Sequence, residues 1–202
     1  FIFLYLFFGI YHVFLYLNRK SERYNLCFGL FAIILFVYLF MRTHTVYALI
    51  HDTGVVFRIE LVSLFMLIPL AGCFFELIIK RSVSIVTKVY GAFCVLLILL
   101  VPFTPYPFAH DVLRVWQATA LIPVLYYALF TIGYSFVRRV RARHRESIRA
   151  SSPRSYLAAV WQTLVGSVTG NILLGMIVLF ATTVFDIIDA VYLSLDLVLT
   201  RY

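Results

Sequence analysis

Glu76 and Lys80 are the charged residues whose spacing inside an apolar run points most directly to chemistry. They stand four residues apart where the run 61–79 ends. On a helix this spacing puts both side chains on one face, with the carboxylate first. An ion pair at the end of the run is one interpretation. A proton-coupled role is the other, because a carboxylate in a membrane-length apolar run is a functional candidate by default.

Polar and small residues gather in the run 157–185. Gln162 and Asn171 are its amides, and Gly166 and Gly170 form a small-xxx-small pattern. Such glycines let two helices approach closely, and amides can hydrogen-bond between helices. We interpret these residues as helix-packing positions, and the alternative is a seam along which helices move.

Four further polar residues are candidates for an outer face: Arg58, Glu60, Asp186 and Asp189. Asp186 and Asp189 share a helix face at a spacing of three residues, so they could meet a cationic ligand, cap a neighbouring helix or be solvated. No second catalytic element accompanies them.

Other residue types indicate neither catalysis nor a cofactor. The chain carries no P-loop, nucleophile elbow, HExxH or kinase signature. Cys27, Cys73 and Cys94 all lie in apolar runs, where a thiol is typically a small packing residue. We therefore predict no catalytic residue, no metal ligand and no cofactor site in this stretch, which leaves open an enzymatic domain elsewhere in a longer protein.

The composition predicts a membrane protein. Hydrophobic residues make up 63% of the 202 residues and charged residues 13%, whereas soluble domains average about 25% charged residues. The net charge of +8 could suggest nucleic acid. The basic residues stand at the ends of apolar runs, so membrane topology explains the charge and we expect no nucleic-acid partner.

Elements that could position these residues are all helical. A spanning helix needs about 20 apolar residues, and the chain offers six candidates. We therefore predict an all-α, polytopic transmembrane helix bundle. The predicted spans are 1–17, 26–41, 61–79, 89–108, 113–137 and 157–185.

Basic loops predict the orientation of the bundle. The loops 19–23, 80–88 and 138–154 are basic and alternate with mixed or acidic ones, and Lys/Arg-rich loops stay in the cytoplasm during insertion. The strongest is a cytoplasmic loop that contains Arg138, Arg139, Arg141, Arg143 and Arg145. Such a loop can bind anionic lipid or an effector.

Several stretches resemble a known family. The strongest is the opening GIYHVFLYL at 9–17, followed by RKSERYNLCFGLF at 19–31. Weaker ones are Arg58-Ile59-Glu60-Leu61 followed by Pro69, DIIDA at 186–190 and LTRY at 199–202. Together they resemble the membrane domain of the seven-transmembrane receptors with diverse intracellular signalling modules.

This resemblance implies a sensor module in the cytoplasmic membrane of a bacterium, with multiple passes. It also implies seven spans, so we expect the six in this chain to stop before a seventh helix. In the full-length chain it would link an extracytoplasmic ligand-binding domain to a cytoplasmic effector such as a cyclase, kinase or phosphatase. The bilayer and a homodimer are the other partners we expect. Two alternatives stay open: a small inner-membrane permease or ion carrier, and a passive membrane anchor.

Overall fold

A computed structural model describes residues 1–149, 156–167 and 170–175 of the chain. These residues contain helices and no strand, so the predicted all-α membrane bundle is confirmed. They fall into two compact units, Phe1–Thr131 and a second that begins at Ile132.

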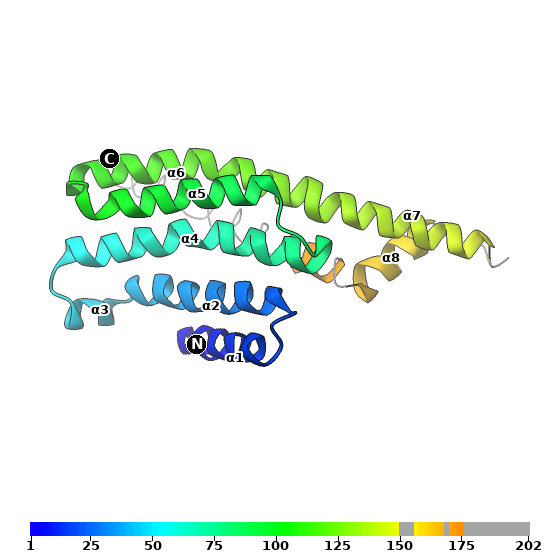
Figure 1. The fold of residues 1–202 in the computed structure, drawn as a ribbon, viewed down its shortest axis with the longest axis horizontal. Coiled ribbons are helices and arrows are strands. Elements are labelled where there is room, and N and C mark those ends of the chain that lie inside the picture. The colour runs from blue at the N-terminus through cyan, green and yellow to red at the C-terminus, as the bar shows by residue number, and fades with distance from the viewer. Residues whose placement is uncertain (150–155, 168–169, 176–202) are drawn as a thin grey trace, which may run out of the picture. The chain divides into compact units, whose positions relative to one another are not determined.

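The first unit begins with helices that run back and forth along one direction (Figure 1). They are α1 (Ile2–Asn18), α2 (Arg23–Met41), the short α3 (His44–Leu49), α4 (Thr53–Lys80), α5 (Ile85–Leu100), the 3-10 turn η1 (Val101–Phe103) and α6 (Tyr106–Tyr126). The π-helical segment η2 (Tyr127–Gly133) follows, and the unit boundary falls inside it. The second unit contains α7 (Tyr134–Arg149) and α8 (Tyr156–Gly166).

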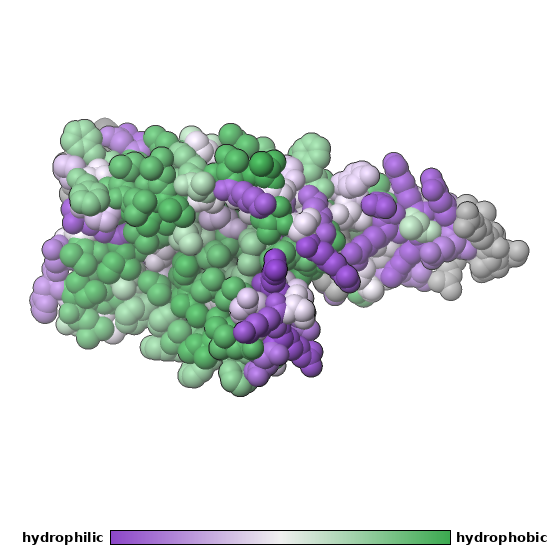
Figure 2. Space-filling model, viewed as in Figure 1, coloured by the Kyte–Doolittle hydropathy of each residue, from purple (hydrophilic) through white to green (hydrophobic). Residues whose placement is uncertain are grey.

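Four described helical stretches are long and apolar enough to cross a membrane. They are Arg23–Met41, Thr53–Lys80, Ile85–Phe103 and Asp111–Glu146, and Ile2–Asn18 is a shorter apolar helix. Figure 2 shows hydrophobic side chains over much of the surface of these helices. Large side chains such as Phe7, Leu99 and Leu121 are exposed, which suits a surface that faces lipid.

Packing inside the first unit centres on α4. Helix α2 lies between α1 and α4, and α4 also contacts α5 and α6 (Figure 1). The rings of Phe65 on α4 and Trp116 on α6 pack in a tilted arrangement at a centroid distance of 5.4 Å. Leu61 and Cys94 are buried in the same cluster. The core therefore joins α4, α5 and α6.

Two glycines allow α1 and α2 to cross closely. A Cβ atom on Gly9 would lie 2.9 Å from the Gly29 carbonyl oxygen, and one on Gly29 would lie 2.9 Å from the Gly9 carbonyl oxygen. Any side chain at either position would force the helices apart. The close crossing thus depends on glycines of two different helices, which spacing along one helix does not pair.

Helix α4 begins well before the predicted span 61–79. The Asp52 carboxylate accepts hydrogen bonds from the backbone N–H groups of Gly54 (2.8 Å) and Val55 (3.3 Å), an N-cap that starts the helix early. The resulting 28 residues extend about 42 Å, beyond the roughly 30 Å of a hydrocarbon core. Arg58 and Glu60, which precede the predicted span, therefore lie in the helix.

Two other boundaries also differ from expectation. Residues 106–108, assigned to the span 89–108, belong to α6, because Pro102 and Pro105 end one helix and Pro105 precedes the next. The arginine-rich segment 138–145, predicted as a loop, is helical in α7. Arginine is a good helix former and no Gly or Pro interrupts the segment.

Candidate functional site

A buried polar cluster forms where α4 ends and α5 begins, and we call it the Glu76 network. Arg81 ends α4 in the left-handed region with φ 59°. The Ser84 hydroxyl then accepts from the Thr87 backbone N–H at 3.4 Å and caps α5. This sharp turn brings the first residues of α5 back beside the last turns of α4. The α1–α2 turn lies at the same end of the first unit (Figure 1).

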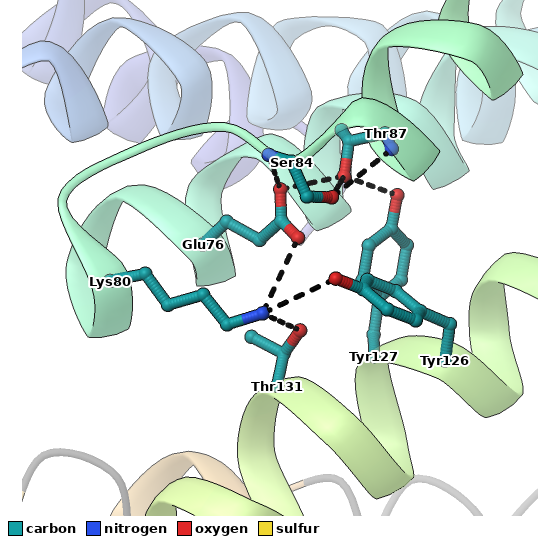
Figure 3. Close-up of polar contacts among 7 residues, drawn as sticks. All are labelled: Glu76, Lys80, Ser84, Thr87, Tyr126, Tyr127 and Thr131. Carbon is teal, nitrogen blue, oxygen red and sulfur yellow. Dashed lines mark hydrogen bonds and ion pairs between the residues drawn. The ribbon is translucent and has the colours of Figure 1, made fainter.

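Glu76 is the centre of the network, and its side chain is fully buried. Its Oε2 accepts from the Ser84 backbone N–H at 2.7 Å and from the Thr87 hydroxyl at 2.7 Å (Figure 3). Two short bonds to one carboxylate oxygen hold α4 to α5. Desolvating a carboxylate is costly, so these donors and the nearby cation are needed to keep it there.

Lys80 supplies that cation, and the predicted pair with Glu76 is confirmed. Its Nζ lies 3.8 Å from Glu76 Oε1, donates to the Thr131 hydroxyl at 3.1 Å and to the Tyr126 hydroxyl at 3.4 Å. It also lies 5.2 Å from the Tyr126 ring centroid, a cation–π contact. Lys80 therefore connects α4 to the end of α6 and to η2 (Figure 3).

Tyr127 closes the network from the other side. Its hydroxyl donates to Thr87 Oγ1 at 3.1 Å, so a chain of hydrogen bonds runs from Tyr127 through Thr87 to Glu76. The phenol lies against Gly72, one turn before Glu76, where a Cβ atom would overlap the ring. Gly72 thus makes the space that lets Tyr127 reach Thr87.

The network suits mechanical coupling better than catalysis. It joins α4, α5 and the α6–η2 segment through one buried carboxylate, and removing one partner of such a cluster leaves a buried polar group unpaired. The π-helical geometry of η2 is itself typical of functional positions. Within the described residues, no group of three or more His, Cys, Asp or Glu residues could hold a metal ion.

Arg58 and Glu60 lie near the opposite end of α4. Arg58 Nη2 donates to the Thr104 carbonyl oxygen at 3.5 Å, and Glu60 Oε1 lies 3.7 Å from Arg42 Nε. They link α4 to the α5–α6 connection and to the end of α2. The structure does not bring them to the Glu76 network.

Polar and small candidates of the second unit do not converge on one site. Gly166 and Asn171 are exposed, and a Cβ atom on Gly166 would meet its nearest neighbour, Arg143 Nη1, at 3.8 Å. A Cβ atom on Gly170 would overlap the carbonyl oxygens of Thr163 and Leu164, which belong to the preceding helix. Gln162 contributes its backbone carbonyl, which accepts from Arg143 Nη1 at 2.5 Å.

The remaining candidates are basic or lie elsewhere in the chain. Arg138, Arg139, Arg141 and Arg145 are exposed on α7, and Arg143 is half-buried. Asp186 and Asp189 lie outside the described residues.

Sequence spacing gave no signal for two groups of residues. Five residues join Glu76 and Lys80 from other segments, the farthest 51 residues from Lys80, and spacing along one helix does not reveal them. They are Ser84, Thr87, Tyr126, Tyr127 and Thr131. Cys27 and Cys73, interpreted as separate packing residues, lie with their Sγ atoms 3.0 Å apart. His12 on α1 is hydrogen-bonded to α2, with its Nδ1 atom 3.0 Å from Asn25 Oδ1.

Comparison with known protein families shows which family the chain belongs to. Residues 1–201 match the family model described as 7TM diverse intracellular signalling. The chain belongs to this family. No curated protein and no solved structure matches it. Membership in the 7TM diverse intracellular signalling family agrees with the apolar helices and identifies the chain as a membrane module of the kind found in signalling proteins.

Proposed function

We propose that this chain is the transmembrane sensor module of a bacterial signalling receptor in the cytoplasmic membrane. It passes an extracytoplasmic stimulus to a cytoplasmic effector domain in the same full-length protein. Family membership over residues 1–201 supports a signalling role. The observation that carries the mechanism is the burial of Glu76. With Lys80, this carboxylate joins three helical segments at the end of the first unit where the basic α1–α2 and α4–α5 turns lie.

This network supports a specific mode of transmission. A signal must shift a population between two arrangements of the helices, and each arrangement must satisfy its own buried groups. The contacts of Lys80 are long or shared enough to be exchanged, with 3.8 Å between Lys80 Nζ and Glu76 Oε1 and 3.4 Å between Lys80 Nζ and the Tyr126 hydroxyl. Displacing α4 against α6 would change which hydroxyls Lys80 meets.

The test compares two carboxylates on the same helix in the full-length receptor. Glu76→Gln should change effector output at normal membrane levels, because it removes the charge that pairs with Lys80. Glu60→Gln is the matched control, since Glu60 lies near the other end of α4 and pairs with Arg42 at 3.7 Å. Unchanged output from Glu76→Gln would reject the mechanism. Substrate flux in reconstituted vesicles, with no effector in the chain, would favour a permease.

The seam along the sixth predicted span remains a second element of the proposal. Gly170 is tight against its own chain, so a larger residue there disturbs the local fold whatever the seam does. Gly166 is open, which makes Gly166→Leu the cleaner variant. If Gly166→Leu leaves effector output and membrane level unchanged, the seam is not where the helices move.

A further inference from the structure

Two cysteines that are far apart in the sequence lie together between α2 and α4. Cys27 Sγ and Cys73 Sγ are 3.0 Å apart, across a separation of 46 residues. Both are free thiols, and both are half-buried. A disulfide has an S–S length of about 2.05 Å, so bond formation would require each sulfur to move by only about 0.5 Å.

The position of the pair decides which reagents can reach it. Cys27 lies four residues after Arg23, the first residue of α2, and Cys73 lies seven residues before Lys80, the last residue of α4. At 1.5 Å per residue, Cys27 is about 6 Å along its helix from Arg23, and Cys73 is about 10 Å along its helix from Lys80. They are therefore inside the apolar part of the bundle but close to its polar edge. Phe28 and Phe74, the next residue on each helix, pack in a tilted arrangement with their ring centroids 5.1 Å apart, so the two helices are in contact here.

We propose that Cys27 and Cys73 form an oxidisable thiol pair that hydroperoxides convert to a reversible disulfide between α2 and α4. One sulfur attacks the terminal peroxide oxygen, the O–O bond breaks, and a sulfenic acid forms with release of an alcohol or water. The second sulfur then attacks the sulfenic sulfur, the S–O bond breaks, and water leaves as the S–S bond forms. The two thiol protons leave with the departing oxygens, and the peroxide is the two-electron oxidant.

Oxidation would join α2 to α4 beside the Glu76 network. Cys73 is three residues before Glu76, so the new bond would lie one turn from the buried carboxylate. Thiols that face a reducing compartment stay reduced at rest and form disulfides transiently. The modification does not depend on the proposed receptor function, because it needs the thiol pair alone.

Cys94 provides an internal control. It is fully buried in α5 and is the third of the three cysteines. The wild-type protein in lipid nanodiscs is treated with hydrogen peroxide or with cumene hydroperoxide, unfolded, and labelled with N-ethylmaleimide. We expect Cys27, Cys73 and Cys94 all to be labelled in the reduced protein and only Cys94 among these three in the oxidised protein. Tandem mass spectrometry should find the Cys27–Cys73 cross-linked peptide.

Variants and reagents separate the outcomes. Cys94→Ser should give the same yield of cross-linked peptide, and Cys27→Ser should give none. A faster reaction with cumene hydroperoxide would indicate lipid hydroperoxides as the source, and a faster reaction with hydrogen peroxide an aqueous source; either supports the pair. Labelling of Cys27, Cys73 and Cys94 after oxidation, loss of Cys94 as fast as Cys27, or cross-links between chains alone would overturn the proposal. The unfolding midpoint should rise on oxidation and return after reduction, because the bond closes a long loop.

Discussion

Thr87 shows how much of the Glu76 network depends on one hydroxyl. It donates to Glu76 Oε2 at 2.7 Å and accepts from Tyr127 at 3.1 Å. Thr87→Val leaves two buried polar groups short of a partner. We expect it to lower the free energy of unfolding by about 1–3 kcal/mol. Thermal unfolding in detergent would measure the loss.

Thr119→Val is the matched control for that measurement. The Thr119 hydroxyl donates to the carbonyl oxygens of Val115 (2.9 Å) and Trp116 (3.0 Å) on its own helix. Backbone carbonyls of a helix already accept one bond, so this loss should be smaller. Equal losses for the two variants would contradict the special role of Thr87.

Glu22 makes one turn of the chain sensitive to pH. It precedes α2, and the Tyr24 hydroxyl, with a smaller effect from the Arg19 guanidinium, lowers the pKa of Glu22 from its ordinary value of 4.5. A lowered pKa in the folded state contributes stability above pH 4.5, and that stability is lost as the pH falls through the folded value. Wild-type protein should therefore unfold at a higher temperature than Glu22→Gln above that pH. The gap should shrink below it, and a gap that does not vary with pH would exclude this linkage.

Spacing within one helix was enough to predict the nearest contact of the site but not its full set. Glu76 and Lys80 are four residues apart, so helical geometry alone predicts that they meet. Thr87 reaches the same carboxylate because Arg81 adopts a left-handed conformation and turns the chain back. That conformation is unusual for a non-glycine residue and has no reliable sequence signature. The Cys27–Cys73 contact likewise depends on how α2 packs on α4.

At the level of elements, the α1–α2 crossing makes the sharpest prediction. A Cβ atom on Gly29 would lie 2.8 Å from Val13 Cγ2 and 2.9 Å from the Gly9 carbonyl oxygen, and the backbone contact cannot relax without moving a helix. Gly29→Ala should cost about 1–3 kcal/mol through overpacking. Gly91→Ala is the control, because a Cβ atom there would meet Pro69 Cβ at an ordinary 3.8 Å. Similar unfolding midpoints for both variants would show that the crossing is loose.

The apolar runs predict that helices form there, but they do not predict the residues at which the helices begin and end. A run such as 61–79 is long enough to form a membrane helix whatever it packs against. The true ends of such a helix depend on local capping, and Asp52 extends α4 back to Thr53. In α7 the charged residues continue the helix. A fall in hydropathy marks the end of the apolar run, but hydropathy does not determine whether a segment is helical.

For the whole molecule, the basic turns predict which side of the membrane each end faces. The positive-inside rule puts the α4–α5 turn in the cytoplasm and α3 outside. With the native cysteines replaced by serine, Thr45→Cys should react with a membrane-impermeant maleimide added to intact cells. Ser82→Cys should react after permeabilisation, and both positions are exposed in the structure. The reverse labelling pattern would invert the topology and would place the Glu76 network on the outer side.

The π-helical segment η2 also has a consequence for how this chain can vary in length. A π-helix closes its hydrogen bonds from i to i+5, one residue more than an α-helix, so η2 accommodates an additional residue without rotating the helix after it. Deleting one residue within Tyr127–Gly133 would restore α-helical geometry. The same deletion in the middle of α4 would turn every later side chain by about 100°. Among homologous chains, single-residue insertions and deletions should therefore concentrate in this segment rather than in α4.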